Sequence, residues 1–247
     1  MNSPDARLPH FQLAPMLDTS PESVLRQSTA DPLAELFLSL AVVFNDVKGL
    51  MWIGEILEDG RPNDGQVSAY GAQWQGIAIQ ITKLACGLVH ELFKLLKNYR
   101  GDLHSAEMKR LLKKVPPGVA KKWKSLIALS GDVGTPSSSL AKSLLKIRNN
   151  VSFHYDQPQM LVRGYCRHFF ELEPSPQNER AYYSAGRNME ETRFYYADAA
   201  VQQSLAILRD RSVNDFNEEL SRVLRDVNVT LAGIISAFLR RRDAGSK

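Results

Sequence analysis

The sequence predicts a mostly α-helical protein, an antiparallel helical bundle with two long N-terminal helices and a small β-hairpin-like insertion. Apolar residues recur at helical spacing over several long segments. Clusters of proline, glycine and small polar residues separate these segments. Only residues 160–196 have the aromatic and branched composition typical of short strands. We therefore expect an extended arm over residues 1–30 and one helical domain over 31–247, with the insertion at about 157–197.

The bulk composition is that of a folded globular protein. Of the 247 residues, 44% are hydrophobic and 23% are charged, which argues against intrinsic disorder. A net charge of +4 permits an acidic partner such as nucleic acid without requiring one. The two cysteines, Cys86 and Cys166, show no metal-binding or disulfide spacing, and we expect Cys86 in the core. With no signal-like or membrane-spanning run recognised, the expected location is the cytoplasm and no membrane is expected as a partner.

The first two long helices follow the arm. The N-terminal arm contains four prolines and is expected to form at most one helical turn, after Ser20. Asp31-Pro32 is a typical helix start, and a breaker cluster at residues 59–65 should end that helix. A second apolar helix is expected from about Gln66 to Asn98, and the short loop between them predicts an antiparallel pair.

Two short helices carry the strongest local concentration of positive charge. They are expected at residues 102–114 and 119–129, and Trp123 lies in the second. A solvated surface is the simpler interpretation, and a surface that follows RNA phosphates is the functional one. A single tryptophan in such a helix is usually buried. The candidate RNA-binding residues are Lys109, Arg110, Lys113, Lys114, Lys121, Lys122 and Lys124.

The next helix ends in an unusually polar sequence. Leu140, Leu144, Ile147 and Val151 form an apolar stripe at helical spacing, and the serines at 137–139 or Thr135-Pro136 supply its N-cap. Its last turns read Arg-Asn-Asn-Val-Ser-Phe-His over residues 148–154, where a purely structural helix would carry Glu, Lys or Ala. This segment is the preferred candidate for a functional site.

The rest of the chain returns to helix after the insertion. Residues 161–170 and 192–196 are expected as short strands around a polar stretch. Helices are then expected at residues 197–209 and 215–242. The last of these ends in Arg240-Arg241-Arg242, where the helix dipole favours cations.

Arg148 and His154 together could cleave RNA without a metal ion. Histidine exchanges a proton near neutral pH, and the planar guanidinium of arginine matches the oxygens of a phosphate. In an ideal helix the two Cα atoms would lie about 9 Å apart along the axis and about 120° apart around it. The two side chains therefore converge only if the helix ends or bends between them, or if a second copy of the chain completes the cleft.

The sequence Ile-Arg-Asn-Asn-Val-Ser-Phe-His-Tyr at residues 147–155 resembles the signature of the HEPN superfamily. In that signature an arginine is followed by a polar residue, and a histidine lies four to six residues further on. The resemblance implies an all-α bundle, and many members are metal-independent endoribonucleases of toxin–antitoxin or phage-defence systems. It assigns catalysis to Arg148 and His154 and an assisting role to Asn149. It also implies RNA as substrate, a homodimer with a shared cleft, an antitoxin or other regulatory protein as partner, and no cofactor.

A second match to the same spacing occurs at Arg163 and His168. There Gly164 follows the arginine and the segment is predicted as a strand, so the first match is preferred. His90-Glu91 lacks the second histidine of a zinc motif, and the glycines at 131–134 lack the lysine of a phosphate-binding loop.

Three functional hypotheses remain open from the sequence. The first is the metal-independent endoribonuclease. The second is a catalytically inactive HEPN-like module that binds RNA or protein. The third is a purely structural helical subunit, whose terminal Asn, Ser and His cap backbone groups while the arginine pairs with a carboxylate.

Overall fold

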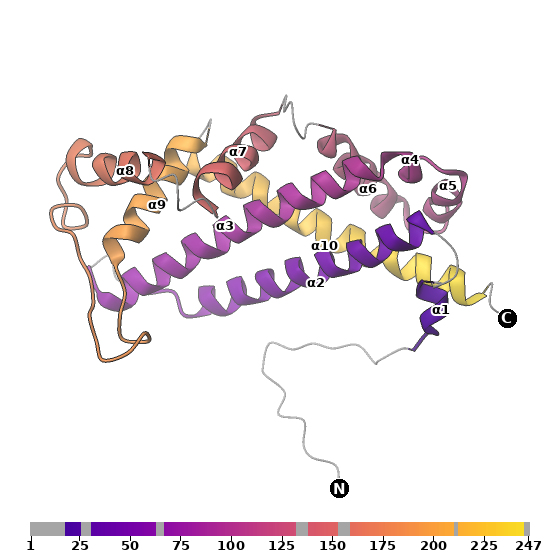
Figure 1. Ribbon diagram of the computed structural model, residues 1–247, viewed down its shortest axis with the longest axis horizontal. Helices are drawn as coiled ribbons and strands as arrows, with labels where there is room; N and C mark the ends of the chain where they lie inside the picture. The colour runs from indigo at the N-terminus through magenta and orange to yellow at the C-terminus, as the bar shows by residue number, and fades with distance from the viewer. Residues whose placement is uncertain are drawn as a thin grey trace, which may run out of the picture.

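The structure is a computed structural model that describes residues 18–25, 31–62, 67–131, 138–152, 159–209 and 212–244. Most of these residues are helical (Figure 1). The α-helices are α1 (Pro21–Val24), α2 (Pro32–Asp59), α3 (Ala69–Asn98), α4 (Arg100–Leu103), α5 (Ala106–Leu112), α6 (Pro117–Ser130), α7 (Ser139–Ile147), α8 (Gln159–Cys166), α9 (Tyr195–Leu208) and α10 (Val213–Ala244). Two π-helical segments, η1 (Arg148–Ser152) and η2 (Arg167–Glu171), continue α7 and α8.

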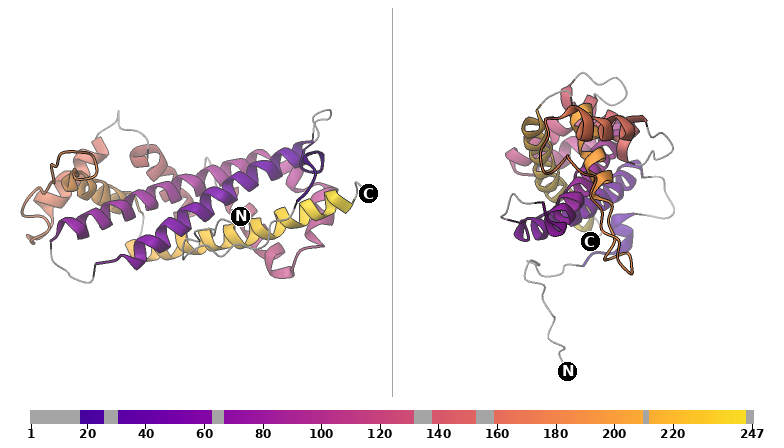
Figure 2. Two further views of the ribbon diagram at one scale, coloured as in Figure 1. Left: turned by 90° about the horizontal axis from the view of Figure 1, so that it is seen from below. Right: turned by 90° about the vertical axis from the view of Figure 1, so that its left-hand side faces the viewer.

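Three long helices, α2, α3 and α10, run along the long axis of the molecule (Figures 1 and 2). Helices α4, α5 and α6 lie at one end, and α8 and α9 lie at the other. Helix α3 contacts α2, α6, α7, η1, α9 and α10, so it is the element that most of the others share. The prediction of a mostly α-helical protein is confirmed for the described residues.

The predicted helix starts are defined by side-chain caps. Asp31 Oδ1 accepts a hydrogen bond from the backbone N–H of Ala34 at 3.0 Å, and Pro32 occupies the first helical position of α2. Ser138 caps α7 in the same way by accepting from Ala141 N–H at 3.2 Å. Of the two N-caps proposed for α7, the serine run is therefore correct. Helix α2 ends at Asp59, where the breaker cluster begins.

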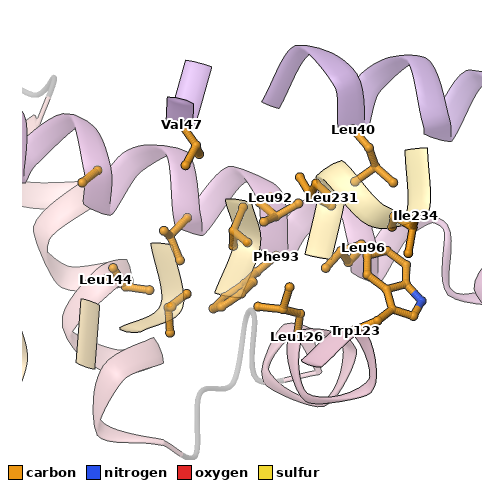
Figure 3. Packing of buried hydrophobic residues seen from close by; sticks show 14 of the residues in the cluster. Leu40, Val47, Leu92, Phe93, Leu96, Trp123, Leu126, Leu144, Leu231 and Ile234 are labelled. Carbon is orange, nitrogen blue, oxygen red and sulfur yellow. The ribbon is translucent and has the colours of Figure 1, made fainter. Parts of the chain in front are cut away.

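One hydrophobic core joins the long helices. Leu92, Phe93 and Leu96 of α3 are buried together with Leu231 and Ile234 of α10 (Figure 3). Trp123 of α6 is fully buried in the same cluster, as expected for a single tryptophan, so it is unavailable for stacking on a base. Cys86 is also fully buried, and burial raises the pKa of its thiol to about 12.

The prediction of strands at residues 161–170 is wrong, because this segment forms α8 and η2. The composition suggested strands, but Met160, Gly164 and His168 recur every four residues and place one side of the segment against α9. The described part of the connection from η2 to α9 contains a single antiparallel bridge, between Ser184 and Arg193. The second predicted strand is replaced by this bridge and by the start of α9 at Tyr195.

Gly164 allows α8 and α9 to approach closely. A Cβ atom at this position would overlap the carbonyl oxygen of Ala200 and the hydroxyl group of Ser204 on α9. Ser204 Oγ also donates to the carbonyl oxygen of Met160 at 2.9 Å, which ties the start of α8 to α9. The close contact between the backbones of α8 and α9 therefore requires glycine at position 164.

The expected turn of helix after Ser20 is present as α1 and packs against α10. Ser20 Oγ accepts a hydrogen bond from Ser23 N–H at 3.2 Å, and Ser23 is buried. The remainder of the predicted arm, residues 1–17 and 26–30, lies outside the described residues.

Two helices, α2 and α3, are long and apolar enough to cross a membrane by length and composition alone. The most apolar window of α3 is 50% buried inside the protein and that of α2 is 28% buried. A buried core helix meets the same criterion. Part of the outer side of α2 is apolar and exposed, at Leu38, Val42, Ile53 and Ile56. The absence of a membrane partner stays a prediction.

The α8–α9 contact predicts different effects for two glycine-to-alanine substitutions. Gly164→Ala should lower the free energy of unfolding by about 1–3 kcal/mol, because backbone atoms of α9 would have to move. The control, Gly54→Ala, lies within α2 with no atom near the added methyl group, so it should be neutral or stabilising by up to about 1 kcal/mol. Urea denaturation followed by circular dichroism measures both. Equal effects would contradict the close approach.

Candidate functional site

The polar end of α7 is positioned by its apolar stripe. Leu140, Leu144, Ile147 and Val151 are all buried, as the helical spacing predicts. Helix α7 and η1 pack along α3, and both also contact α9. The backbone that carries Arg148 and Asn149 is therefore fixed against the central helix of the protein.

The α-helical geometry ends just before Arg148. Helix α7 finishes at Ile147, and residues 148–152 form the π-helical segment η1. Short π-helical turns are uncommon and frequently occur at functional sites. The α-helix ends before Arg148 and the π-helical turn continues to Ser152, so the end or bend of the helix expected between Arg148 and His154 stays a prediction. His154 and Phe153 lie outside the described residues.

Arg148 lies beside a carboxylate at the surface. Its Nε atom is 3.6 Å from Oε1 of Glu91 on α3, and the side chains of Arg148 and Glu91 are 38% and 50% exposed. Its Nη1 atom donates to Oδ1 of Asn149 at 3.2 Å. An ion pair this long and this exposed contributes about 0–1 kcal/mol. The guanidinium is thus oriented by Glu91 and Asn149 and still accessible from solvent.

The neighbouring asparagines have different surroundings. Asn149 is exposed and contacts Arg148 as described. Asn150 donates from Nδ2 to the carbonyl oxygen of Lys146 at 2.8 Å, which satisfies a backbone acceptor near the end of α7. The hydrogen bond of Asn150 and the Arg148–Glu91 ion pair are contacts expected of a purely structural helix end. The accessible guanidinium of Arg148, which a functional site requires, is present as well.

His90 lies on α3 next to Glu91 and is buried. Burial lowers the pKa of His90, with a smaller opposing effect from Glu91 and further lowering by Arg148 and Lys94. His90 is therefore neutral at physiological pH, and it precedes Glu91, the ion-pair partner of Arg148, on α3. Neither His90 nor Glu91 was assigned to this site from sequence, since no local pattern links α3 to residue 148.

The second match to the motif spacing, Arg163 and His168, differs from the first in its packing and not in its secondary structure. Its segment is helical, so the predicted strand does not distinguish it. Instead, Gly164 packs against α9, and His168 is buried with Nε2 3.1 Å from the carbonyl oxygen of Gln177. The buried histidine ring has a structural partner, whereas Arg163 is exposed on α8.

The basic residues of α5, α6 and the turn between them are mostly exposed. Lys122 is the member with a described ion pair, 2.6 Å from Asp226 of α10. The exposed members are Lys109, Arg110, Lys113, Lys114, Lys121 and Lys124. These helices lie at one end of the molecule, away from α8 and α9 (Figure 1). Among the described residues, no cluster of three or more His, Cys, Asp or Glu side chains could hold a metal ion.

Comparisons with known proteins add no assignment: no protein-family model matches this chain, and neither curated proteins nor solved structures give a match.

The buried, neutral state of His90 predicts a pH-dependent stability. The unfolded chain binds a proton at this histidine near pH 6.5, whereas the lowered pKa keeps the folded chain neutral there. The free energy of unfolding should therefore fall as the pH falls below about 6.5, by at most about 1.4 kcal/mol per pH unit. Above this pH, His90 should add no pH dependence to the free energy of unfolding.

Urea denaturation between pH 5 and 8 measures this dependence. His90→Leu should reduce the loss of stability at acidic pH, whatever its effect at pH 8. The control His104→Leu changes an exposed histidine and should keep the wild-type profile. Identical pH profiles for His90→Leu and the wild type would refute the buried neutral state.

Proposed function

We propose that the protein is a metal-independent endoribonuclease of the HEPN type, with Arg148 and His154 as catalytic residues and Asn149 as an assisting polar group. The observation that carries the proposal is the half-exposed guanidinium of Arg148, held beside Asn149 where the α-helix changes to a π-helical turn. The resemblance of residues 147–155 to the HEPN signature supplies the function, and the mostly helical fold is compatible with it.

The proposed reaction uses the 2′-hydroxyl group of RNA as the nucleophile. His154 removes its proton, the 2′-oxygen attacks phosphorus, and the bond to the 5′-oxygen of the next nucleotide breaks. Arg148 stabilises the negative charge that develops on the phosphate oxygens. The 5′-oxygen leaves as a hydroxyl group after receiving a proton from water, and protonated His154 returns its proton to the solvent. The other product is a 2′,3′-cyclic phosphate. The nucleophile belongs to the substrate, so DNA cannot react in this way.

Glu91 is expected to orient Arg148 in the free protein. The two side chains are exposed and separated by 3.6 Å, so an incoming phosphate competes with a weak ion pair. In the proposed active form, two copies of the chain place their motifs in a shared cleft. An antitoxin or another regulatory protein would control the activity, in a toxin–antitoxin or phage-defence setting.

The catalytic proposal predicts cleavage of pooled RNA in the presence of EDTA. Arg148→Ala and His154→Ala should each lower the cleavage rate by at least about 100-fold, because one removes the phosphate-binding group and the other removes the general base. Arg163→Ala is the matched control, since it removes an exposed arginine from the rejected motif match, and it should cleave like the wild type. Products should end in 2′,3′-cyclic phosphate, and DNA of the same sequence should stay intact. Undiminished cleavage by either catalytic variant would eliminate that assignment.

An RNA-binding module without catalysis is the second candidate, favoured by the exposed basic residues of α5 and α6. It predicts RNA binding with no cleavage in EDTA. The triple variant Lys113→Gln, Lys114→Gln and Lys121→Gln should weaken binding and lower the slope of log K against log salt by up to about 3, roughly one for each phosphate that is no longer neutralised. His154→Ala should bind like the wild type. An unchanged salt slope in the triple variant would exclude these lysines as the RNA-binding surface.

A further inference from the structure

A half-open pocket lies at the opposite end of the molecule from α5 and α6. The first turns of α3, η2, the connection between η2 and α9, and α9 itself form its walls. Its volume is about 710 Å³, within the range of about 300–1,000 Å³ usual for small-molecule sites. Neither Arg148 nor Glu91 lines it. The pocket is therefore separate from the candidate catalytic site.

Side-chain contacts hold the pocket walls in place. Arg193 makes two contacts with Asp198 of α9, Nε to Oδ2 at 2.7 Å and Nη2 to Oδ1 at 3.2 Å. This pair lies directly over Gly76 of α3, where a Cβ atom would overlap the guanidinium. The hydroxyl groups of Ser184 and Tyr195 are 2.9 Å apart and link the connection to α9. These contacts indicate a pocket that exists before a ligand binds.

The lining is rich in aromatic residues and includes a pair of amide side chains. Six aromatic side chains contribute to it, namely Trp74, Phe169, Tyr182, Tyr183, Tyr195 and Tyr196. Aromatic side chains favour stacking against a planar ring. Gln75 donates from Nε2 to Oε1 of Gln202 at 2.9 Å, which leaves an acceptor on Gln75 and donors on Gln202. A planar ligand with adjacent donors and acceptors on its edge fits such an arrangement.

The charges of the lining favour a neutral or anionic ligand over a cation. Among the lining residues that the structure describes, Asp198 is the carboxylate, and Arg193 neutralises it. Arg180 is exposed on the connection, with no ion pair to any described residue. A guanidinium in this position suits a phosphate group.

We propose that this pocket binds a nucleoside monophosphate. The base stacks among the aromatic side chains, its edge is recognised by Gln75 and Gln202, and its phosphate contacts Arg180. Purine and pyrimidine edges carry the neighbouring donors and acceptors that the amide pair requires. The site does not depend on the proposed ribonuclease activity, because it shares no residue with the Arg148 site.

Isothermal titration calorimetry of the full chain in EDTA with AMP, GMP, CMP and UMP tests the proposal. At least one nucleotide should bind with Kd below about 1 mM. Gln202→Leu should weaken its binding by at least about fivefold, the effect of losing a hydrogen bond to the base. Arg163→Ala, which removes an exposed arginine outside the pocket, is the matched control and should bind like the wild type. If none of the four nucleotides binds at about 10 mM, ten times the expected upper limit of Kd, the proposal is overturned.

Two further arms keep the test decisive if Gln202→Leu does not fold. Arg180→Ala changes an exposed residue and should remove the preference for a monophosphate over the corresponding nucleoside. Ribose 5-phosphate should not compete, because it lacks the base. If ribose 5-phosphate competes as well as the nucleotide, the site recognises the sugar phosphate and not the base, which would refute the proposal. If only Arg148→Ala loses binding, the nucleotide binds at the candidate catalytic site, which would also refute it.

Discussion

The burial of α3 is the packing interaction on which most of the structure depends. Val89, Leu92, Phe93 and Leu96 are almost completely removed from water by α2, α6, α7 and α10. Each such side chain contributes about 1.5–3 kcal/mol when fully buried. Helix α3 also supplies Glu91 to the candidate catalytic site and Gln75 to the pocket. Both sites are therefore carried by the same rigid helix, separated by about 24 Å along its axis.

The packing of α7 on α3 explains why Arg148 has a contact of the kind found at a purely structural helix end. The apolar stripe of α7 fixes the backbone at Ile147, and the π-helical turn that carries Arg148 begins at the next residue. Arg148 meets Glu91 because α7 packs on α3, and the exposed pair lets the guanidinium leave its partner at small cost. The contact that stabilises Arg148 in the free protein is therefore weak enough to be exchanged for another partner.

The sequence predicted those parts of the fold that local signals determine. Asp31-Pro32 and the serine run at 137–139 identified real helix starts, because caps act over three or four residues. The prediction of strands at residues 161–170 was wrong, because the aromatic composition of this segment is typical of strands. The contact of Gly164 with α9, which favours the helix, is a tertiary feature that the local sequence does not show. The motif at 148–154 was visible as a pattern. Glu91, His90 and the Gln75–Gln202 pair were not, because packing brings together residues that are far apart in the chain.

The contact between Asp31 and Arg242 links the first turn of α2 to the last turn of α10. Asp31 Oδ1 caps α2, while its Oδ2 accepts from Nη2 of Arg242 at 2.6 Å, and Arg242 also lies 5.0 Å from the ring of Phe238. Helix ends ordinarily fray independently. Here, opening either end removes a partner from the other, so the amide hydrogens at these two ends should exchange with solvent as one cooperative unit.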